Sequence, residues 1–289
     1  MKYTNSKVEE IKFNNKKFFV KRDDLLDKDF SGNKARKFYY FLKNDFQNIT
    51  KIISHGSSQS NAMYSLSVLC KIRNWDFDYY VDHIAGYLKA NPIGNYKEAI
   101  ENGMNIIEKK LDDEVSKDLD KSVHDNTLFI PEGGALEEAS FGIKILANEI
   151  ITWAEENNTT DLKVFLPSGT GTTALYLQKY LPFEVITCAC VGDEEYLKKQ
   201  FLELEKDNHP RIIALDKKHH FGKLYKEFYE IHNELKKQTN IEFDLLYDSK
   251  GWLCVSKYLV DYKSDILYIH QGGILGNISM LQRYQNKYN

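Results

Sequence analysis

The amino-acid sequence predicts an α/β fold with a mostly parallel sheet. Apolar, β-branched stretches alternate with helical patterns from end to end, which is typical of right-handed βαβ units. A hydrophobic content of 42% and a charged content of 28% are ordinary for a globular protein. A length of 289 residues suffices for one large domain or two medium ones.

Seven apolar segments are predicted to be buried strands, namely residues 51–54, 77–81, 104–107, 127–130, 162–166, 184–190 and 266–270. Helical spacing predicts helices over residues 61–73, 141–155 and 224–237. The polar segment 155–161 is the clearest linker, and a break near Asn157 would leave two α/β regions. The charged segment 108–125 is expected to be a loop or an exposed helix.

Charge and composition exclude several classes of function. The formal net charge of -3 argues against a nucleic acid as the main partner. No apolar run is long enough for a signal peptide or a membrane span, so we expect a cytoplasmic protein with no membrane partner. The cysteines lack metal-binding spacing, the pair His219-His220 is expected at the surface, and no metal is predicted.

The segment of residues 30–42 contains two lysines near the start of a predicted helix. Ser31-Gly32-Asn33 is a turn and cap sequence, so Lys34 falls in the first helical turn with Lys37 one turn later on the same side. An ammonium group there opposes the helix dipole. A lysine that forms an imine or pairs with an anion avoids this cost, although two exposed surface lysines would also explain the pattern.

Two further segments place a polar loop between a strand and a helix. His55 to Ser60 precedes the helix at Asn61 and could bind a carboxylate, or be an ordinary capped loop. Residues 168–173 (SGTGTT) could bind a phosphate through backbone amides and hydroxyls. This second loop also fits a dinucleotide pattern through Gly169, Gly171 and Ala174, with Asp193 where a ribose-binding acid would lie.

Together these segments resemble one family. KRDDL (21–25) followed by SGNKARK (31–37) resembles the signature of 1-aminocyclopropane-1-carboxylate (ACC) deaminases and D-cysteine desulfhydrases. Further similar segments follow in the family's order: SSQSNAM (57–63), PEGGAL with Ser140-Phe141-Gly142, the SGTGTT loop, FDLLYDSKG (243–251) and YIHQGGILG (268–276).

The resemblance implies fold type II of the pyridoxal 5'-phosphate (PLP) enzymes. In that fold, two open, twisted, mostly parallel α/β domains hold PLP in the cleft between them. The larger domain would comprise residues 1–44 and 149–289, and the smaller, inserted domain residues 45–148. The resemblance also implies a homodimer that binds a small amino-acid substrate.

Residue roles follow from the matching positions. Lys34 matches the lysine that holds PLP as a Schiff base and moves the substrate α-proton. Lys37 and the loop Ser168, Gly169, Thr170, Gly171 and Thr172 match the phosphate site. Asn61 matches the partner of the pyridine 3-oxygen, and Asp248 the residue facing the pyridine nitrogen. Gln59, Ser60 and Asn61 match substrate-binding positions, with Ser60 also a candidate nucleophile or base. Tyr247 matches a catalytic tyrosine above the substrate.

Three positions depart from the family pattern. Phe221 replaces a tyrosine, Leu245 a proline, and Gln271 the leucine of the deaminases or the threonine of the desulfhydrases. The resemblance implies a PLP-dependent lyase or deaminase that converts D-cysteine or an ACC-like amino acid into a 2-oxo acid and ammonia through an α-carbanion. A racemase or a β-replacement enzyme is an alternative within this class. A non-catalytic PLP or amino-acid binding protein, or a dinucleotide-dependent oxidoreductase, are alternatives outside it.

Overall fold

The computed structural model describes residues 3–109 and 126–288, so most of the charged segment 108–125 lies outside the described residues. A six-stranded sheet forms the larger layer, with the strand order β1-β2-β10-β7-β8-β9. Its strands are β1 (Val8–Phe13), β2 (Lys16–Arg22), β7 (Leu162–Ser168), β8 (Glu184–Ala189), β9 (Arg211–Ile212) and β10 (Asp265–His270). All pairs are parallel except the hairpin of β1 and β2.

A separate four-stranded sheet has the order β5-β4-β3-β6 and is parallel throughout. Its strands are β3 (Lys51–His55), β4 (Asp76–Val81), β5 (Met104–Glu108) and β6 (Thr127–Ile130). The two sheets confirm the predicted α/β class, and each of the seven predicted strands is present to within a residue or two at its ends.

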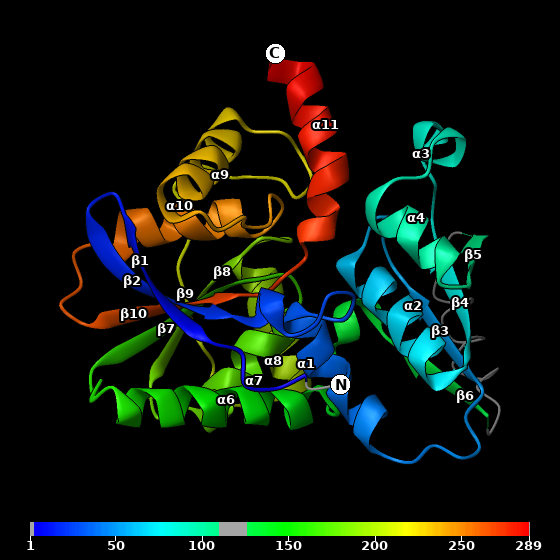
Figure 1. Cartoon of the computed structure of the whole chain (residues 1–289), viewed down its shortest axis with the longest axis horizontal. Coiled ribbons are helices and arrows are strands. Elements are labelled where there is room, and N and C mark those ends of the chain that lie inside the picture. Colours follow the sequence, from blue (N-terminus) through cyan, green and yellow to red (C-terminus); the bar gives the residue numbers. More distant parts are fainter. Residues whose placement is uncertain (1–2, 110–125, 289) are drawn as a thin grey trace.

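Helices cover both sheets (Figure 1). They are α1 (Gly32–Lys43), α2 (Asn61–Arg73), α3 (Gly86–Ala90), α4 (Gly94–Glu101), α6 (Ala139–Glu156), α7 (Thr172–Tyr180), α8 (Glu194–Leu204), α9 (Lys226–Thr239), α10 (Asp248–Tyr258) and α11 (Asn277–Tyr288). On the large sheet, α6 and α7 pack on one face, and α9 and α10 pack on the other. None of the described helices has the length and apolar character that a membrane crossing requires.

The predicted helix 61–73 coincides with α2, whose residues Ala62, Leu66, Leu69 and Cys70 are all buried as expected. The predicted helices 141–155 and 224–237 correspond to α6 and α9. Both Cys188 and Cys190 are buried as expected, but only Cys188 lies in β8, because the strand ends one residue before Cys190.

The hairpin β1–β2 is absent from the predicted elements. It joins the large sheet through β2, which pairs with β10. Its two-residue turn consists of Asn14 and Asn15, both with positive φ of 50° and 60°. Such a turn matches the twist of an antiparallel hairpin. An early segment of the chain therefore returns to the sheet formed by the later residues, which the expected break near Asn157 did not reveal.

The domain boundaries remain a proposal, which the packing of α6 refines. This helix contains residues 148 and 149, and its buried residues pack with β7, β8 and β10 of the large sheet. We therefore propose that the inserted domain, predicted as residues 45–148, ends before Ala139 and that α6 belongs wholly to the larger domain.

Candidate active site

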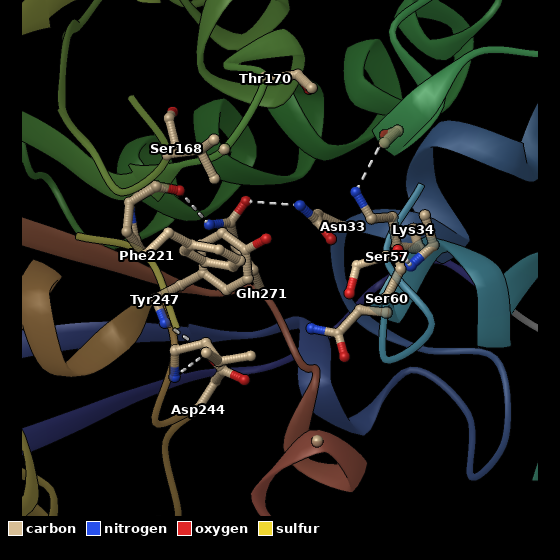
Figure 2. Close-up of a pocket in the computed structure, with 18 of the residues that line it drawn as sticks. Asn33, Lys34, Ser57, Ser60, Ser168, Thr170, Phe221, Asp244, Tyr247 and Gln271 are labelled. Atoms are coloured by element: carbon tan, nitrogen blue, oxygen red, sulfur yellow. Dashed lines mark hydrogen bonds between the residues drawn. The ribbon is translucent and has the colours of Figure 1, made fainter. Parts of the chain in front are cut away.

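A cavity of about 420 Å³ is lined by loops and helix starts that follow strands of both sheets. The residues that the family resemblance assigns to the site all lie in its wall, and Figure 2 shows Lys34, Ser60, Ser168, Thr170 and Tyr247 among them. These residues are Lys34, Lys37, Gln59, Ser60, Asn61, Ser168, Gly169, Thr170, Gly171, Thr172, Tyr247 and Asp248. The fold thus assembles in one place segments that are far apart in the sequence.

Lys34 and Lys37 lie one turn apart on α1 and face the same partner. Their Nζ atoms donate to the backbone carbonyl of Gly133, at 3.0 Å from Lys34 and 2.9 Å from Lys37. Burial lowers the pKa of Lys34 to about 8, although nearby Glu132 acts in the opposite direction. Burial and the charge of Lys34 hold the pKa of Lys37 well below its usual range. Two ammonium groups at one carbonyl repel each other, so the site favours a neutral amine.

The start of α1 is held by a buried ion-pair network. Arg36 is almost fully buried and binds Asp23 at 2.8 Å and Glu149 of α6 at 2.7 Å. Glu149 also pairs with Lys21 of β2 at 2.7 Å. The charged residues of KRDDL and SGNKARK that make up this network therefore serve as a scaffold, which fixes the position of Lys34 between β2 and α6.

The start of α2 forms a second wall of the cavity. Ser60 is the N-cap, and its Oγ accepts from the backbone amides of Ala62 at 3.1 Å and Met63 at 3.4 Å. These amides are thereby satisfied. The Ser60 side chain also hydrogen-bonds to that of Tyr79. Asn61 is fixed by Asn95, whose Nδ2 donates to Asn61 Oδ1 at 2.6 Å.

The loop from Ser168 to Thr173 joins β7 to α7 at a third wall. Gly171 has a φ of 75°, and a Cβ there would collide with Phe201 and Leu197, so this residue must be glycine. The hydroxyl of Ser168 is bonded to that of Thr187 at 2.7 Å. Thr173, which also lines the cavity, has a buried Oγ1 without a hydrogen-bond partner among the described residues. An unsatisfied hydroxyl in the first turn of a helix is suited to binding an anion.

Asp193 does not serve as a ribose-binding acid in this structure. Its carboxylate caps α8, where Oδ1 accepts from the amide of Tyr196 at 3.0 Å. Asp193 is not part of the cavity wall. The dinucleotide pattern therefore lacks its acidic member, which removes the main support for the oxidoreductase alternative.

Two buried carboxylates lie together beside the cavity. Asp248 Oδ1 accepts from the Tyr268 hydroxyl at 2.7 Å, and Oδ2 accepts from the amide of Asp244 at 3.0 Å. The Oδ1 of Asp244 accepts from the amides of Leu246 and Tyr247, but its Oδ2 has no partner among the described residues. Burial raises the pKa of each carboxyl group to about 7. Asp244 was not predicted from the sequence.

Gln271 and Phe221, two of the positions that depart from the family pattern, lie in the cavity wall (Figure 2). Gln271 Nε2 donates to the Pro167 carbonyl at 2.6 Å, and its Oε1 accepts from Asn33 at 2.9 Å. Gln271 therefore ties the end of β7 to the start of α1. The ring of Phe221 lies 5.2 Å from that of Tyr247, and burial raises the pKa of the tyrosine.

Other polar residues differ from expectation. His219 is buried rather than at the surface, because its ring packs against Tyr225 and Phe228 and its Nε2 contacts Glu227 at 3.1 Å. His220 is exposed as expected.

Arg283 of α11 lines the cavity and was not predicted.

Comparisons with known proteins show a likeness in structure. No model of a protein family matches the chain, and no curated protein matches its sequence. The structure is similar to that of an ACC deaminase homologue, with a TM-score of 0.77 and 19% identity over 99% of this chain and 96% of the other. A hydrogen sulfide-producing enzyme from Fusobacterium nucleatum gives a TM-score of 0.63 and 14% identity, covering 93% of this chain and 95% of the other. A pyridoxal 5'-phosphate-dependent aspartate racemase gives a TM-score of 0.63 and 11% identity, covering 93% of this chain and 90% of the other.

At these identities the likeness shows the fold, and it extends over nearly the whole chain. The predicted architecture is thereby confirmed: the chain has the two-sheet α/β fold of the ACC deaminase homologue.

Proposed function

We propose that the chain is a PLP-dependent enzyme that acts on a small amino acid. One observation carries this proposal: an amine of lowered pKa and a phosphate-type loop meet at a single residue. The Gly133 carbonyl accepts from Lys34, and a Cβ on the same glycine would lie 3.0 Å from Thr170 of the loop. A small ligand with an aldehyde at one end and a phosphate at the other can reach both.

The residues present fit this cofactor. Thr173 supplies an unsatisfied hydroxyl at the loop, which would bind the phosphate together with Lys37 and the backbone amides of residues 169–172. Lys34 would hold the aldehyde carbon. Asp248 would accept a hydrogen bond from the ring nitrogen, and Asn61 would donate to the 3-oxygen. PLP, when bound, supplies an electron sink for the pair released at the substrate α-carbon.

The chain's own groups would then bind the substrate and move its protons. Ser60 and Gln59 would bind the substrate carboxylate at the start of α2. Lys34, whose pKa is lowered to about 8, would take the α-proton near neutral pH. Tyr247 lies in the cavity wall and would exchange a proton with the substrate side chain. For D-cysteine, loss of sulfide from the β-carbon and hydrolysis would give a 2-oxo acid and ammonia. For ACC, opening of the ring and hydrolysis would give 2-oxobutanoate and ammonia. These two are the substrates that the sequence resemblance favours.

The test is a visible absorption spectrum of the purified protein with PLP added, before and after borohydride, followed by peptide mapping. We expect an absorbance band that borohydride removes and a covalent adduct on Lys34. Lys34→Ala should lack both the adduct and the activity, whereas Lys71→Ala, a change on the surface of α2, should retain them. A wild-type protein that gains no visible band with PLP would rule the proposal out. The homodimer remains a prediction that sedimentation can test.

A further inference from the structure

Arg283 is a cation of the cavity wall that has no acidic partner. In the described part of the chain, no carboxylate lies within 4.0 Å of its guanidinium group. Its Nη1 donates to Met280 Sδ at 3.1 Å and its Nη2 donates to the Gly222 carbonyl at 3.0 Å. The side chain is only partly buried and lines the cavity, so its remaining N–H donors are open to solvent or to a ligand.

Arg283 in the cavity wall and Arg36 in the core differ in how many of their N–H donors have hydrogen-bond partners. Arg36 is saturated by two carboxylates, Asp23 and Glu149. A guanidinium group has five N–H donors, and Arg283 uses two of them on neutral acceptors. Its planar fork is suited to a carboxylate or a similar anion. An anion bound at Arg283 would therefore accept hydrogen bonds from the guanidinium donors that have no partner among the described residues.

Lys34, Lys37 and Asp248 of the cavity wall already have hydrogen-bond partners among the described residues. The carboxylate of Asp244, in contrast, has one oxygen without a partner there. Lys34 and Lys37 both donate to Gly133, on the side of the cavity wall that touches Thr170. Asp248 is bonded to Tyr268 and to the amide of Asp244. Arg283 instead donates to the carbonyl of Gly222, which follows Phe221, whose ring packs against that of Tyr247 at an interplanar angle of 52°. Tyr247 is the residue proposed to face the substrate side chain, so Arg283 borders the same part of the cavity.

We propose that the cavity takes a small amino acid whose side chain ends in an anionic group, and that Arg283 binds this group. This inference rests on the proposed function as a PLP-dependent enzyme and assigns the substrate class of the same site, in place of D-cysteine and ACC, neither of which carries such a group. Arg283 would bind the side-chain anion only. The start of α2 would bind the α-carboxylate, which is common to all amino acids.

The experiment compares a charged ligand with its neutral isostere. Binding of aspartate and asparagine, each as the D and L form, is measured by calorimetry on the PLP-supplemented protein. The variants are Arg283→Gln, Arg283→Lys and the control Lys287→Gln. Lys287 is on the same helix and likewise donates to a loop carbonyl, that of Leu224, but it is not part of the cavity wall.

We expect the wild type to prefer one aspartate enantiomer over the matching asparagine by at least about tenfold, the effect of a charge-assisted hydrogen bond. Arg283→Gln should remove this preference with little change in asparagine binding, and Arg283→Lys should recover part of it. Lys287→Gln should bind as the wild type does. A melting temperature for each variant checks that the fold is retained.

Three results would overturn the inference. The first is a wild type that shows no preference for the charged ligand. The second is an equal loss of both ligands in a folded Arg283→Gln, which would place the α-carboxylate at Arg283. The third is a loss of PLP affinity alone, which would assign the arginine to the phosphate. Failure of the proposed function is seen separately, as the absence of the visible band in the wild type.

Discussion

Gly32 packs its α-carbon directly against the backbone carbonyl of Gln271. The contact joins the first residue of α1 to the turn that follows β10, and Asn33 strengthens it by donating its amide to the same carbonyl at 3.0 Å. The position of Lys34, two residues after Gly32, is thus set by a residue more than two hundred positions later in the chain.

Gly32→Ala should therefore damage both stability and the site. A Cβ would collide with the Gln271 carbonyl at a φ of 65°, so α1 must shift. We expect the free energy of unfolding in urea to fall by about 2 kcal/mol or more, and PLP uptake to fall with it. Gly222→Ala is the matched control, because its φ of 72° is similar but no atom lies within 4 Å of the added Cβ. That change should cost only about 1 kcal/mol. Equal losses in the two variants would contradict the packing argument.

The lowered pKa of Lys34 predicts the pH dependence of PLP attachment. The reactive amine is the neutral form, whose fraction increases with pH. Because burial lowers the pKa to about 8, the rate of appearance of the visible band should rise with a midpoint near pH 8. A midpoint close to the ordinary lysine value of 10.5 would contradict this. Lys37→Met should weaken PLP binding, because Lys37 is proposed to bind the phosphate, but peptide mapping should still find the adduct on Lys34.

Asp244 predicts the pH dependence of stability in the protein without cofactor. Burial raises its pKa from 3.8 to about 7, so the folded protein holds this proton more tightly than the unfolded chain. The free energy of unfolding should therefore fall as the pH rises between these values and then level off. Asp244→Asn, which keeps an acceptor for Leu246 and Tyr247, should stabilise the protein by more than about 1 kcal/mol at pH 8 and have little effect at pH 4.

The control for this prediction is Asp193→Asn. Asp193 also accepts from a backbone amide, as the N-cap of α8, but its side chain is exposed. Its replacement should leave the pH profile of the melting temperature unchanged. A similar shift in both variants would show that burial of Asp244 is not the cause.

Removal of the Arg36 charge is expected to lower the free energy of unfolding by a large amount. Arg36→Met leaves Asp23 and Glu149 without their shared cation in a buried site, and breaking such a pair costs about 3 kcal/mol. Lys51→Met is the comparison, since its partner Asp78 belongs to a partly exposed pair that contributes less than about 1 kcal/mol. Urea denaturation of both variants measures the difference. A loss below about 1 kcal/mol for Arg36→Met would contradict the scaffold role.

Short-range patterns in the sequence predict the regular elements that bury a face. The strand at Thr127–Ile130 and the helix α2 have the predicted limits, because each has apolar residues on its buried side and polar residues at its ends. The hairpin β1–β2 carried a signal that was overlooked. Asn14-Asn15 separates two alternating runs, yet the many lysines and glutamates of these runs disguise the alternation.

The site could be predicted where a motif holds several of its residues, as it does around Lys34 and at the SGTGTT loop. Arg283 and Asp244 were missed for a physical reason. A single arginine in an amphipathic C-terminal helix has the pattern of a solvated residue, and only the position of α11 beside the cavity shows that Arg283 lines it. His219 was wrongly expected at the surface, since the aromatic rings that bury it come from the following helix and its entry loop.

The place of β2 between β1 and β10 constrains the order in which the molecule can form. Phe19 is paired with Leu267, so the large sheet cannot close until β10 has left the ribosome. The small sheet needs only residues 51–130 and can form much earlier. During synthesis one edge of the hairpin therefore stays unpaired until β10 has been made. Lys34 reaches its final position only when β10 has paired with β2.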